Sequence, residues 1–289
     1  MHSKMQMRKK NIIYTFALVG MFLLFNSCEK EYESIENIDD AKIQAYLKQN
    51  NISMTKDPSG FYYQIVNPGT GDVLLNKDSV LYDFDLKSLD GTVYQSSNPL
   101  GNNGNYLGYV NPTPFRLAIL NLKRGGSAKV IVPSYLAFGK NGNGNIPSNE
   151  IILSDVKVYA QKSQVELDDD RIKAFLLAKG ITATKHSSRV YYQVITPGTG
   201  TEPIDNFTTV VFSYTGRIIN GAQFDTGTAF STSLPYVIQG WQKIIPLFTK
   251  GAKIRIFIPS DLAYGSVGNV GIPSNVPLDF DIEITEVKN

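Results

Sequence analysis

The sequence is 289 residues long, with 28 basic and 26 acidic residues, one cysteine and two histidines. At roughly 100–200 residues per domain, this length predicts two ordinary domains. Four basic residues and no acidic ones lie in residues 1–27, so the rest of the chain is slightly acidic although the formal charge is +2. The absence of a basic stripe argues against nucleic acid as a partner. One cysteine excludes a disulfide framework, and so few cysteines and histidines exclude an ordinary zinc site.

The N-terminus has the pattern of an export signal. Three basic residues, Arg8, Lys9 and Lys10, precede an apolar run over residues 12–25. The run is shorter than the ~20 residues of a membrane span and fits a signal peptide. It ends in Leu-Phe-Asn-Ser-Cys, which resembles a bacterial lipobox and would make Cys28 the lipidated first residue of the mature protein.

We therefore expect a lipoprotein signal peptide over residues 1–27 and an acidic tether over residues 28–38. The protein would be exported and held by its lipid at the cell envelope, with the outer membrane as the expected site and its periplasmic or surface face left open. The alternatives are an ordinary signal peptide, or an N-terminal anchor helix with an incidental cysteine.

The remainder of the chain contains two copies of one sequence pattern. Residues 43–71 align without gaps to residues 172–200, with 14 of 29 positions identical, and Ile-Pro-Ser-Asn recurs at 146–149 and 272–275. Such dense identity indicates duplication. We expect a first repeat over residues 39–160, a second repeat over residues 168–289, and a linker over residues 161–167.

Each repeat is predicted to begin with a short helix. In the second repeat, residues 168–170 are three aspartates that suit a helix N-terminus, and Gly180 suits its left-handed end. Ile172, Phe175 and Leu176 form one apolar stripe. In the first repeat, Asp39-Asp40 and Asn51 would play the same parts. The aspartates lack the spacing of a calcium loop.

Period-two patterns then predict antiparallel strands. Residues 253–258 and 278–284 alternate, with apolar side chains on one face and mostly charged side chains on the other. One face should therefore lie on a core and the other in water. With glycine and proline about every ten residues, the fold class is α+β and mainly β.

Residues 210–286 resemble an FKBP-type peptidyl-prolyl cis-trans isomerase domain. The matching motifs are Tyr-Thr-Gly at 214–216, Gly-Ala-Gln-Phe-Asp at 221–225, Val-Ile-Gln-Gly-Trp at 237–241 and Leu-Ala-Tyr-Gly at 262–265, closed by Gly-Ile-Pro at 271–273 and Phe-Asp at 280–281. The resemblance implies a twisted antiparallel sheet wrapped around a short helix in each repeat. Tandem domains of this kind behind a lipobox resemble a Bacteroidetes lipoprotein.

The resemblance also implies an active pocket between helix and sheet. It makes Asp225, Tyr264, Tyr214 and Trp241 the catalytic residues, with Trp241 as the floor beneath the prolyl ring. It makes Phe224, Phe230, Val237, Ile238, Ile272 and Phe280 the substrate-binding residues. The Ile238 N–H would bind a substrate carbonyl. The implied partners are proline-containing, unfolded or partly folded exported polypeptides, and no cofactor or metal is needed because no covalent bond breaks.

The second repeat departs from the family pattern in three places. Only residues 226–229 separate Asp225 from Phe230, no arginine there can pair with Asp225, and Asn269 stands in the loop over the pocket. These departures leave substrate preference and macrolide binding open.

The first repeat shares the sequence pattern of the second but has different residues at the pocket positions. Aligned against the second repeat, Phe84 replaces Tyr214, Tyr94 replaces Phe224, Gln95 replaces Asp225, Phe138 replaces Tyr264 and Ser154 replaces Phe280, while Phe115 is the nearest candidate for Trp241. We therefore expect the first repeat to bind polypeptide and not to catalyse. Its glycine- and asparagine-rich loops over residues 101–105 and 141–145 lack the Lys-Ser/Thr of a phosphate-binding loop and are predicted to be flexible turns.

Two functional hypotheses follow. The first is an exported, lipid-anchored prolyl isomerase whose second repeat is active and whose first repeat assists substrate capture. The second is a non-catalytic tandem adaptor that holds peptide without turning it over. His186 lies in the turn after the second helix and is interpreted as a solvated loop residue. No cluster of exposed aromatic residues argues for glycan binding.

Overall fold

A computed structural model describes residues 33–288. The expected signal peptide, Cys28 and the first residues of the tether lie outside the described residues. Within residues 33–288, no helix is both long and apolar enough to cross a membrane.

The two repeats form two antiparallel sheets with the same strand order. In the second repeat the order is β11-β12-β15-β16-β13-β14, and in the first it is β1-β2-β9-β10-β4-β7, where β5 also pairs with β10 and β6 pairs with β5. A separate pair, β3 and β8, completes the first repeat. The strands of the second repeat are β11 (Thr184–Lys185), β12 (Tyr191–Thr196), β13 (Thr209–Ile218), β14 (Gln223–Ser233), β15 (Lys253–Ile258) and β16 (Leu278–Lys288). Those of the first are β1 (Thr55–Lys56), β2 (Tyr62–Asn67), β3 (Thr70–Val73), β4 (Ser79–Phe84), β5 (Leu86–Lys87), β6 (Val93–Gln95), β7 (Asn103–Tyr106), β8 (Lys123–Arg124), β9 (Ser127–Val132) and β10 (Ile152–Val158).

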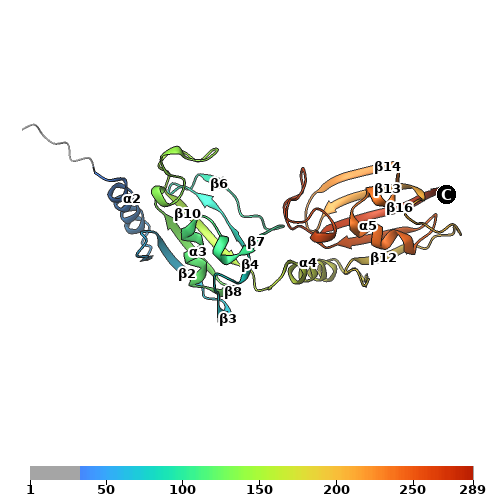
Figure 1. Ribbon diagram of the computed structural model, residues 1–289, viewed down its shortest axis with the longest axis horizontal. Coiled ribbons are helices and arrows are strands. Elements are labelled where there is room, and N and C mark those ends of the chain that lie inside the picture. Colours follow the sequence, from blue (N-terminus) through green and yellow to red (C-terminus); the bar gives the residue numbers. More distant parts are fainter. Residues whose placement is uncertain (1–32, 289) are drawn as a thin grey trace, which may run out of the picture. The chain divides into compact units, whose positions relative to one another are not determined.

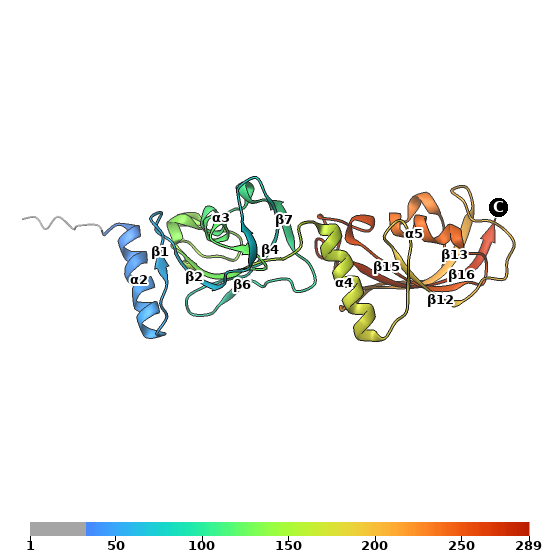
Figure 2. The same cartoon turned by 90° about the horizontal axis from the view of Figure 1, so that it is seen from below.

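Each sheet is covered by a helix on either face (Figures 1 and 2). The inner helices are α3 (Thr113–Leu120) and α5 (Gln239–Ile244), and the outer helices are α2 (Ile35–Gln49) and α4 (Gln164–Lys179). In the second repeat, Trp241 and Ile244 of α5 pack with Ile256 in the main core. The outer helix α4 packs its apolar stripe against the other side of the same strands, at Phe257 and Tyr191. The fold is therefore α+β and mainly β, as predicted. Short 3-10 helices lie at Leu107–Tyr109, Ser134–Leu136, Gly139–Asn141, Leu234–Tyr236, Ile245–Leu247 and Ser260–Leu262.

The prediction that the aspartates cap the outer helices was wrong. Helix α4 begins at Gln164, inside the expected linker, and its N-cap is Ser163, whose side chain accepts a hydrogen bond from the Glu166 N–H. Asp168 instead lies one turn inside the helix, fully buried, where its Oδ2 accepts bonds from the N–H and hydroxyl of Ser260 at 2.7 and 2.6 Å. Burial raises the pKa of Asp168, and the bonds from Ser260 oppose this. The aspartate thus clamps α4 to the segment that follows β15.

The first repeat contains the same clamp. Asp39 of α2 is fully buried, and its Oδ2 accepts bonds from the N–H and hydroxyl of Ser134 at 2.8 and 2.7 Å. The left-handed helix ends were predicted correctly, since Gly180 and Asn51 both have positive φ.

The charged face of β15 and β16 is less exposed than the alternation predicted. Phe257 is fully buried because α4 covers it. Asp279 is only 2% exposed, and Arg255 donates to both of its carboxylate oxygens at 2.8 and 2.6 Å. A buried carboxylate is tolerated when it is paired and hydrogen-bonded in this way.

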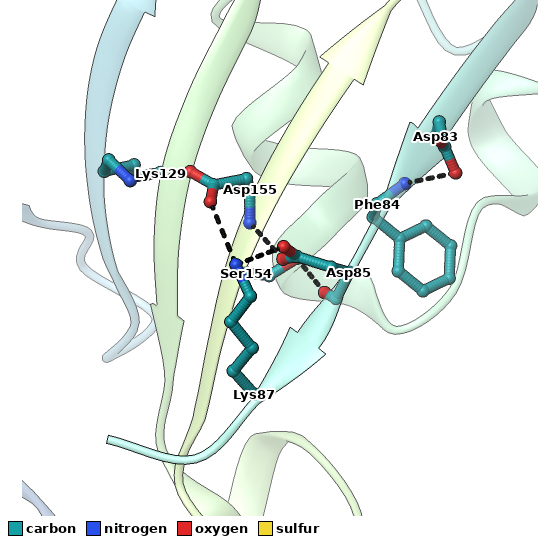
Figure 3. A network of polar contacts seen from close by, with 7 residues as sticks. All are labelled: Asp83, Phe84, Asp85, Lys87, Lys129, Ser154 and Asp155. Atoms are coloured by element: carbon teal, nitrogen blue, oxygen red, sulfur yellow. Dashed lines mark hydrogen bonds and ion pairs between the residues drawn. The ribbon is translucent and has the colours of Figure 1, made fainter. Parts of the chain in front are cut away.

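The first sheet is interrupted where the second has the continuous strand β13. Asp85 lies between β4 and β5, and its Oδ1 accepts the Asp155 N–H of β10 at 2.7 Å, a bond that a strand carbonyl would otherwise accept (Figure 3). Its carbonyl accepts the Ser154 hydroxyl at 2.6 Å. Lys87 pairs with both Asp85 and Asp155. A side chain thus replaces part of the backbone ladder and divides one strand into two.

Candidate functional site

A pocket of about 150 Å³ lies in the second repeat, between α5 and the sheet. Its aromatic lining is Tyr214, Phe230, Tyr236, Trp241, Tyr264 and Phe280. Asp225, Val237 and Ile238 complete the lining. Asp225 is the only charged side chain among them, so the pocket is apolar with one acid at its side.

Trp241 is the floor of the aromatic cluster. It is the third residue of α5 and is 3% exposed. Its ring meets those of Phe212, Tyr214 and Phe280 edge to face, at centroid distances of 5.2, 5.4 and 5.3 Å. Edge-to-face packing on three sides fixes the indole plane. The indole N–H has no hydrogen-bond partner among the described residues.

Tyr214 and Asp225 form the polar pair of the pocket. The Tyr214 hydroxyl donates to Asp225 Oδ2 at 2.8 Å, and the Thr226 N–H donates to Asp225 Oδ1 at 2.8 Å. Burial and the bond to this carboxylate raise the pKa of Tyr214 to about 12, so it stays a neutral donor at physiological pH. In the described part of the chain, Asp225 has no ion-pair partner, consistent with the missing arginine.

Ile238 is the N-cap of α5, with extended backbone angles. Its carbonyl accepts the first bond of the helix from the Trp241 N–H at 3.0 Å. Its own N–H forms no hydrogen bond within residues 33–288. Backbone N–H groups at a helix N-terminus are satisfied by side chains, water or a ligand, and this one belongs to a pocket-lining residue.

Tyr264 opens the loop that carries Ile272. The loop is closed by paired backbone bonds between Asn269 and Ile272, at 2.9 and 2.8 Å. The side chains of Val267 and Val270 at its tip are 90% and 96% exposed. The loop therefore exposes two apolar side chains to solvent close in sequence to Tyr264, which lines the pocket.

The structure brings eight of the ten predicted site residues into the lining. The other two lie behind it: Phe224 packs on the Phe280 ring at 5.6 Å, and Ile272 is 4% exposed in the same core. Sequence reasoning missed Tyr236, which lines the pocket although it is 83% exposed. Its place directly before Val237 was the available signal.

The short segment between Asp225 and Phe230 is part of a strand and not a loop. It belongs to β14, which pairs with β13 from Gln223 to Ser233 with two register shifts. At one shift Ala229 has φ of 55°, as in a bulge. The bulge places Asp225 opposite Gly216 and Phe230 opposite Phe212.

The structure aligns the two repeats position by position. Phe84 lies opposite Val156 as Tyr214 lies opposite Ile282, and Gln95 lies opposite Leu86 as Asp225 lies opposite Gly216. At the inner helix, Phe115 is the third residue of α3, as Trp241 is of α5. The N-cap of α3 is Pro112, so at the position of Ile238 the first repeat has no N–H.

One pair of substitutions between the repeats is compensated. In the second repeat a Cβ on Gly216 would lie 2.5 Å from the Phe280 ring, so only glycine fits beside that ring. In the first repeat the glycine position holds Leu86, 6% exposed, and the phenylalanine position holds the small, fully buried Ser154. In the first repeat the larger side chain of this pair is therefore Leu86 on one strand, whereas in the second repeat it is Phe280 on the neighbouring strand.

The described histidine and acidic residues form no cluster of metal ligands. Within residues 33–288, no group of three histidine, cysteine, aspartate or glutamate side chains is arranged to hold an ion. His186 bonds to Ser188 in its own turn, with 2.8 Å between Nδ1 and Oγ.

Known proteins similar to this chain share one family. The family described as FKBP-type peptidyl-prolyl cis-trans isomerase matches residues 72–159 and 200–285. The chain is similar to the FKBP-type peptidyl-prolyl cis-trans isomerase FkpA of Escherichia coli K12, 41% identical over 118 residues, which are 39% of this chain and 43% of that protein. A probable FKBP-type isomerase of Haemophilus influenzae is 32% identical over 148 residues, covering 50% of this chain and 61% of the relative.

Two solved structures are among the proteins similar to this chain. The crystal structure of Escherichia coli FkpA is 36% identical, with a TM-score of 0.38, and covers 45% of this chain and 64% of that one. A peptidyl-prolyl isomerase of Pseudomonas syringae pv. tomato is 31% identical, with a TM-score of 0.38, and covers 45% of this chain and 99% of that one. The chain thus spans less than half of the first curated relative. Because the family match extends over both repeats and more than half of the sequence, the chain belongs to the FKBP-type peptidyl-prolyl cis-trans isomerase family.

Proposed function

We propose that the second repeat catalyses cis-trans isomerisation of Xaa-Pro bonds in exported polypeptides. The reaction rotates a partial double bond with a barrier of ~18–20 kcal/mol and takes tens of seconds uncatalysed. No covalent bond breaks, so the protein needs to bind the twisted amide more tightly than the planar one.

The pocket offers the means to do so. The apolar rings around Trp241 would hold the prolyl ring and exclude water. Desolvation favours the twisted amide because the planar form is more polar and better hydrated. The free N–H of Ile238 would hold a substrate carbonyl, while Asp225 and the Tyr264 hydroxyl would face the rotating amide.

The observation that carries this proposal is the Tyr214–Asp225 hydrogen bond beside an aromatic pocket floored by Trp241. The test is the cis-trans exchange rate of an Xaa-Pro tetrapeptide in the presence of the full chain. We expect acceleration that falls by at least about tenfold in Asp225→Asn/Tyr264→Phe, the size expected when polar groups that act in the transition state are lost. The matched control is Asp261→Asn, because Asp261 pairs with Arg189 outside the pocket.

A folded chain that accelerates no Xaa-Pro peptide would contradict the proposal. The remaining function would then be that of an adaptor that binds peptide without turnover.

We further propose that the first repeat binds polypeptide and does not catalyse. Gln95 and Phe84 remove the acid and the hydroxyl of the polar pair, and Pro112 removes the backbone donor. With the groups that would address the rotating amide absent, apolar contact is what this repeat can offer a client.

The lipobox-like sequence supports export and a lipid anchor on Cys28, with the outer membrane as the proposed location. The proposed domain boundaries are residues 39–160 and 168–289, joined by a linker over residues 161–167.

A further inference from the structure

The first repeat retains an open cavity where the second repeat has its pocket. The cavity measures about 520 Å³, against about 150 Å³ in the second repeat. Phe84, Leu86 and Phe138 line it on the sheet side and at the following loop. The first repeat therefore has an open cavity although it lacks the acid and the tyrosine hydroxyl of the second repeat.

The walls of this cavity are apolar. Leu86 and Ile146 are 6% and 7% exposed and belong to the main core of the repeat. The Phe84 ring rests on Phe115, with 5.1 Å between centroids, and is held at that position. Such walls suit a bulky hydrocarbon side chain, whose burial is favourable in proportion to its apolar area.

The rim of the cavity is polar but uncharged. Gln95, Asn111, Asn143 and Asn145 supply four carboxamides, and no charged residue contributes to the lining. The side chains of Gln95 and Asn143 form no hydrogen bond within residues 33–288. A carboxamide both donates and accepts, so it matches a peptide backbone group in either orientation.

Proline has no special place in this cavity. In the second repeat the Ile238 N–H is the group proposed to donate to a substrate carbonyl. The equivalent residue of the first repeat, Pro112, has no N–H. The acid of the polar pair is replaced by Gln95. A ligand would therefore be selected for its apolar side chain and for the absence of charge, since a charged group would be desolvated without a partner.

We propose that this cavity binds an uncharged polypeptide segment through one bulky apolar side chain, aromatic or aliphatic, without a requirement for proline. This rests on the proposed function in one respect, that the chain acts on polypeptides. One repeat would hold a proline-free part of a client while the other acts on its prolyl bonds. Two linked sites raise the local concentration of client at each other.

A peptide explains the lining better than a sugar does. Binding sites are specified by a few polar groups placed against the ligand. Here Leu86 and Ile146 present hydrocarbon to the interior, and the carboxamides are confined to the residues at the rim.

The test measures binding of a fluorescein-labelled, proline-free peptide of alternating phenylalanine and glutamine to the full chain, by anisotropy. Asn145→Trp and, separately, Asn143→Trp place an indole in the cavity from exposed positions, and each should weaken binding by about tenfold, as expected when one buried apolar side chain loses its site. Asn141→Trp is the control, because Asn141 is exposed in the same loop and does not line the cavity. Replacing the phenylalanines of the peptide by glutamate should weaken binding similarly.

Three results would overturn the proposal. They are equal binding by the tryptophan variants and the Asn141→Trp control, no binding by the parent chain, or displacement of the peptide from the parent chain by a neutral oligosaccharide such as maltoheptaose.

Circular dichroism of each variant verifies that it is folded. The proposed isomerase activity is read separately, from Xaa-Pro exchange. The chain's single tryptophan, Trp241, should not change its fluorescence with this proline-free peptide.

Discussion

At the scale of single residues, the Tyr214–Asp225 contact organises the second pocket. Tyr214 packs on Trp241 and donates to Asp225, so one side chain links the apolar floor to the acid. Without the arginine that the family pattern offers, Asp225 relies on Tyr214 and the Thr226 N–H for its position.

Tyr214→Phe should therefore lower kcat/KM by about tenfold, because a hydrogen bond to a charged group contributes about 1.5–3 kcal/mol and this one is partly exposed. Stability should fall by no more than about 1 kcal/mol. The measurements are peptide exchange kinetics and urea unfolding. Tyr192→Phe is the matched control, since Tyr192 packs on Phe248 outside the pocket. An unchanged kcat/KM in Tyr214→Phe would show that the polar pair is not used.

A second residue-scale prediction concerns the compensated pair. Gly216→Leu should destabilise the second repeat by about 1–3 kcal/mol, because its Cβ would lie 2.5 Å from the Phe280 ring. Adding Phe280→Ser recreates the arrangement of Leu86 and Ser154. The double variant should be more stable than the two single effects predict, by about 1 kcal/mol or more, while isomerase activity stays low because Phe280 lines the pocket. Strict additivity in urea unfolding would refute this coupling.

Most residues that line the pocket of the second repeat could be predicted from the sequence, because they lie in short motifs that are typical of the family. Sequence reasoning did not assign Pro112 to the position of Ile238, because the inner helices differ in length and residues 111–114 match no motif of the second repeat. It also missed Tyr236, which is exposed and whose signal in the sequence was its place directly before Val237.

At the scale of elements, the outer helices are fixed to their sheets by buried and half-buried aspartates. Asp169 of α4 accepts hydrogen bonds from Lys173, Lys185 and the Tyr191 hydroxyl, the last two from the strands beneath. Burial acts to raise the pKa of Asp169, but these bonds outweigh it and lower the pKa to about 2.

Asp169→Asn should therefore lower the free energy of unfolding at pH 7 by about 1 kcal/mol, a figure discounted for solvent screening. The folded-state pKa lies below the unfolded value of 3.8, so this stabilisation is present above about pH 4 and is lost as pH falls towards 2. Urea unfolding of both proteins at pH 7, 4 and 3 measures the difference. Asp170→Asn, at an exposed position of the same helix, is the control. A difference that stays constant between pH 7 and 3 would contradict the assignment.

The helix starts also show a limit of sequence reasoning. Consecutive aspartates at residues 168–170 satisfy the rule for helix N-termini, but the chain places them a turn further in, where Ser260 and Lys185 bind them. Ser163 and Glu166 form the N-terminal cap instead. The sequence thus contains two possible N-terminal caps, Ser163 and the aspartates at residues 168–170. The contacts of the aspartates with Ser260 and Lys185 form only in the folded chain and cannot be predicted from a single sequence.

At the scale of the whole molecule, two repeats of one fold contain cavities with different linings. Both repeats keep the strand order, the inner helix and the buried aspartate clamp. The second keeps an acid, a tyrosine hydroxyl and a free N–H around a small pocket, whereas the first has a larger, uncharged cavity. The duplication could be predicted from the sequence, but the open cavity could not, because loop residues 143–146 line it and a single sequence does not give the position of that loop.

The lipid anchor is a prediction at this scale. Cys28→Ser should abolish incorporation of radiolabelled palmitate into the chain expressed in a bacterial host, because Cys28 is the only cysteine in the sequence. The variant should also leave the membrane fraction. Undiminished labelling, or persistent membrane association of an unlabelled chain, would argue for an anchor helix in place of the lipid.

The central claim is that prolyl turnover occurs in the pocket floored by Trp241. Because this is the chain's only tryptophan, its fluorescence reports on that pocket alone. The most direct measurement is a titration of the full chain with an Xaa-Pro peptide, recording Trp241 fluorescence and catalysed cis-trans exchange in the same samples. We predict that both signals change and saturate over the same range of peptide concentration. Exchange that accelerates with no change at Trp241, or fluorescence that saturates with no catalysed exchange, would contradict the claim.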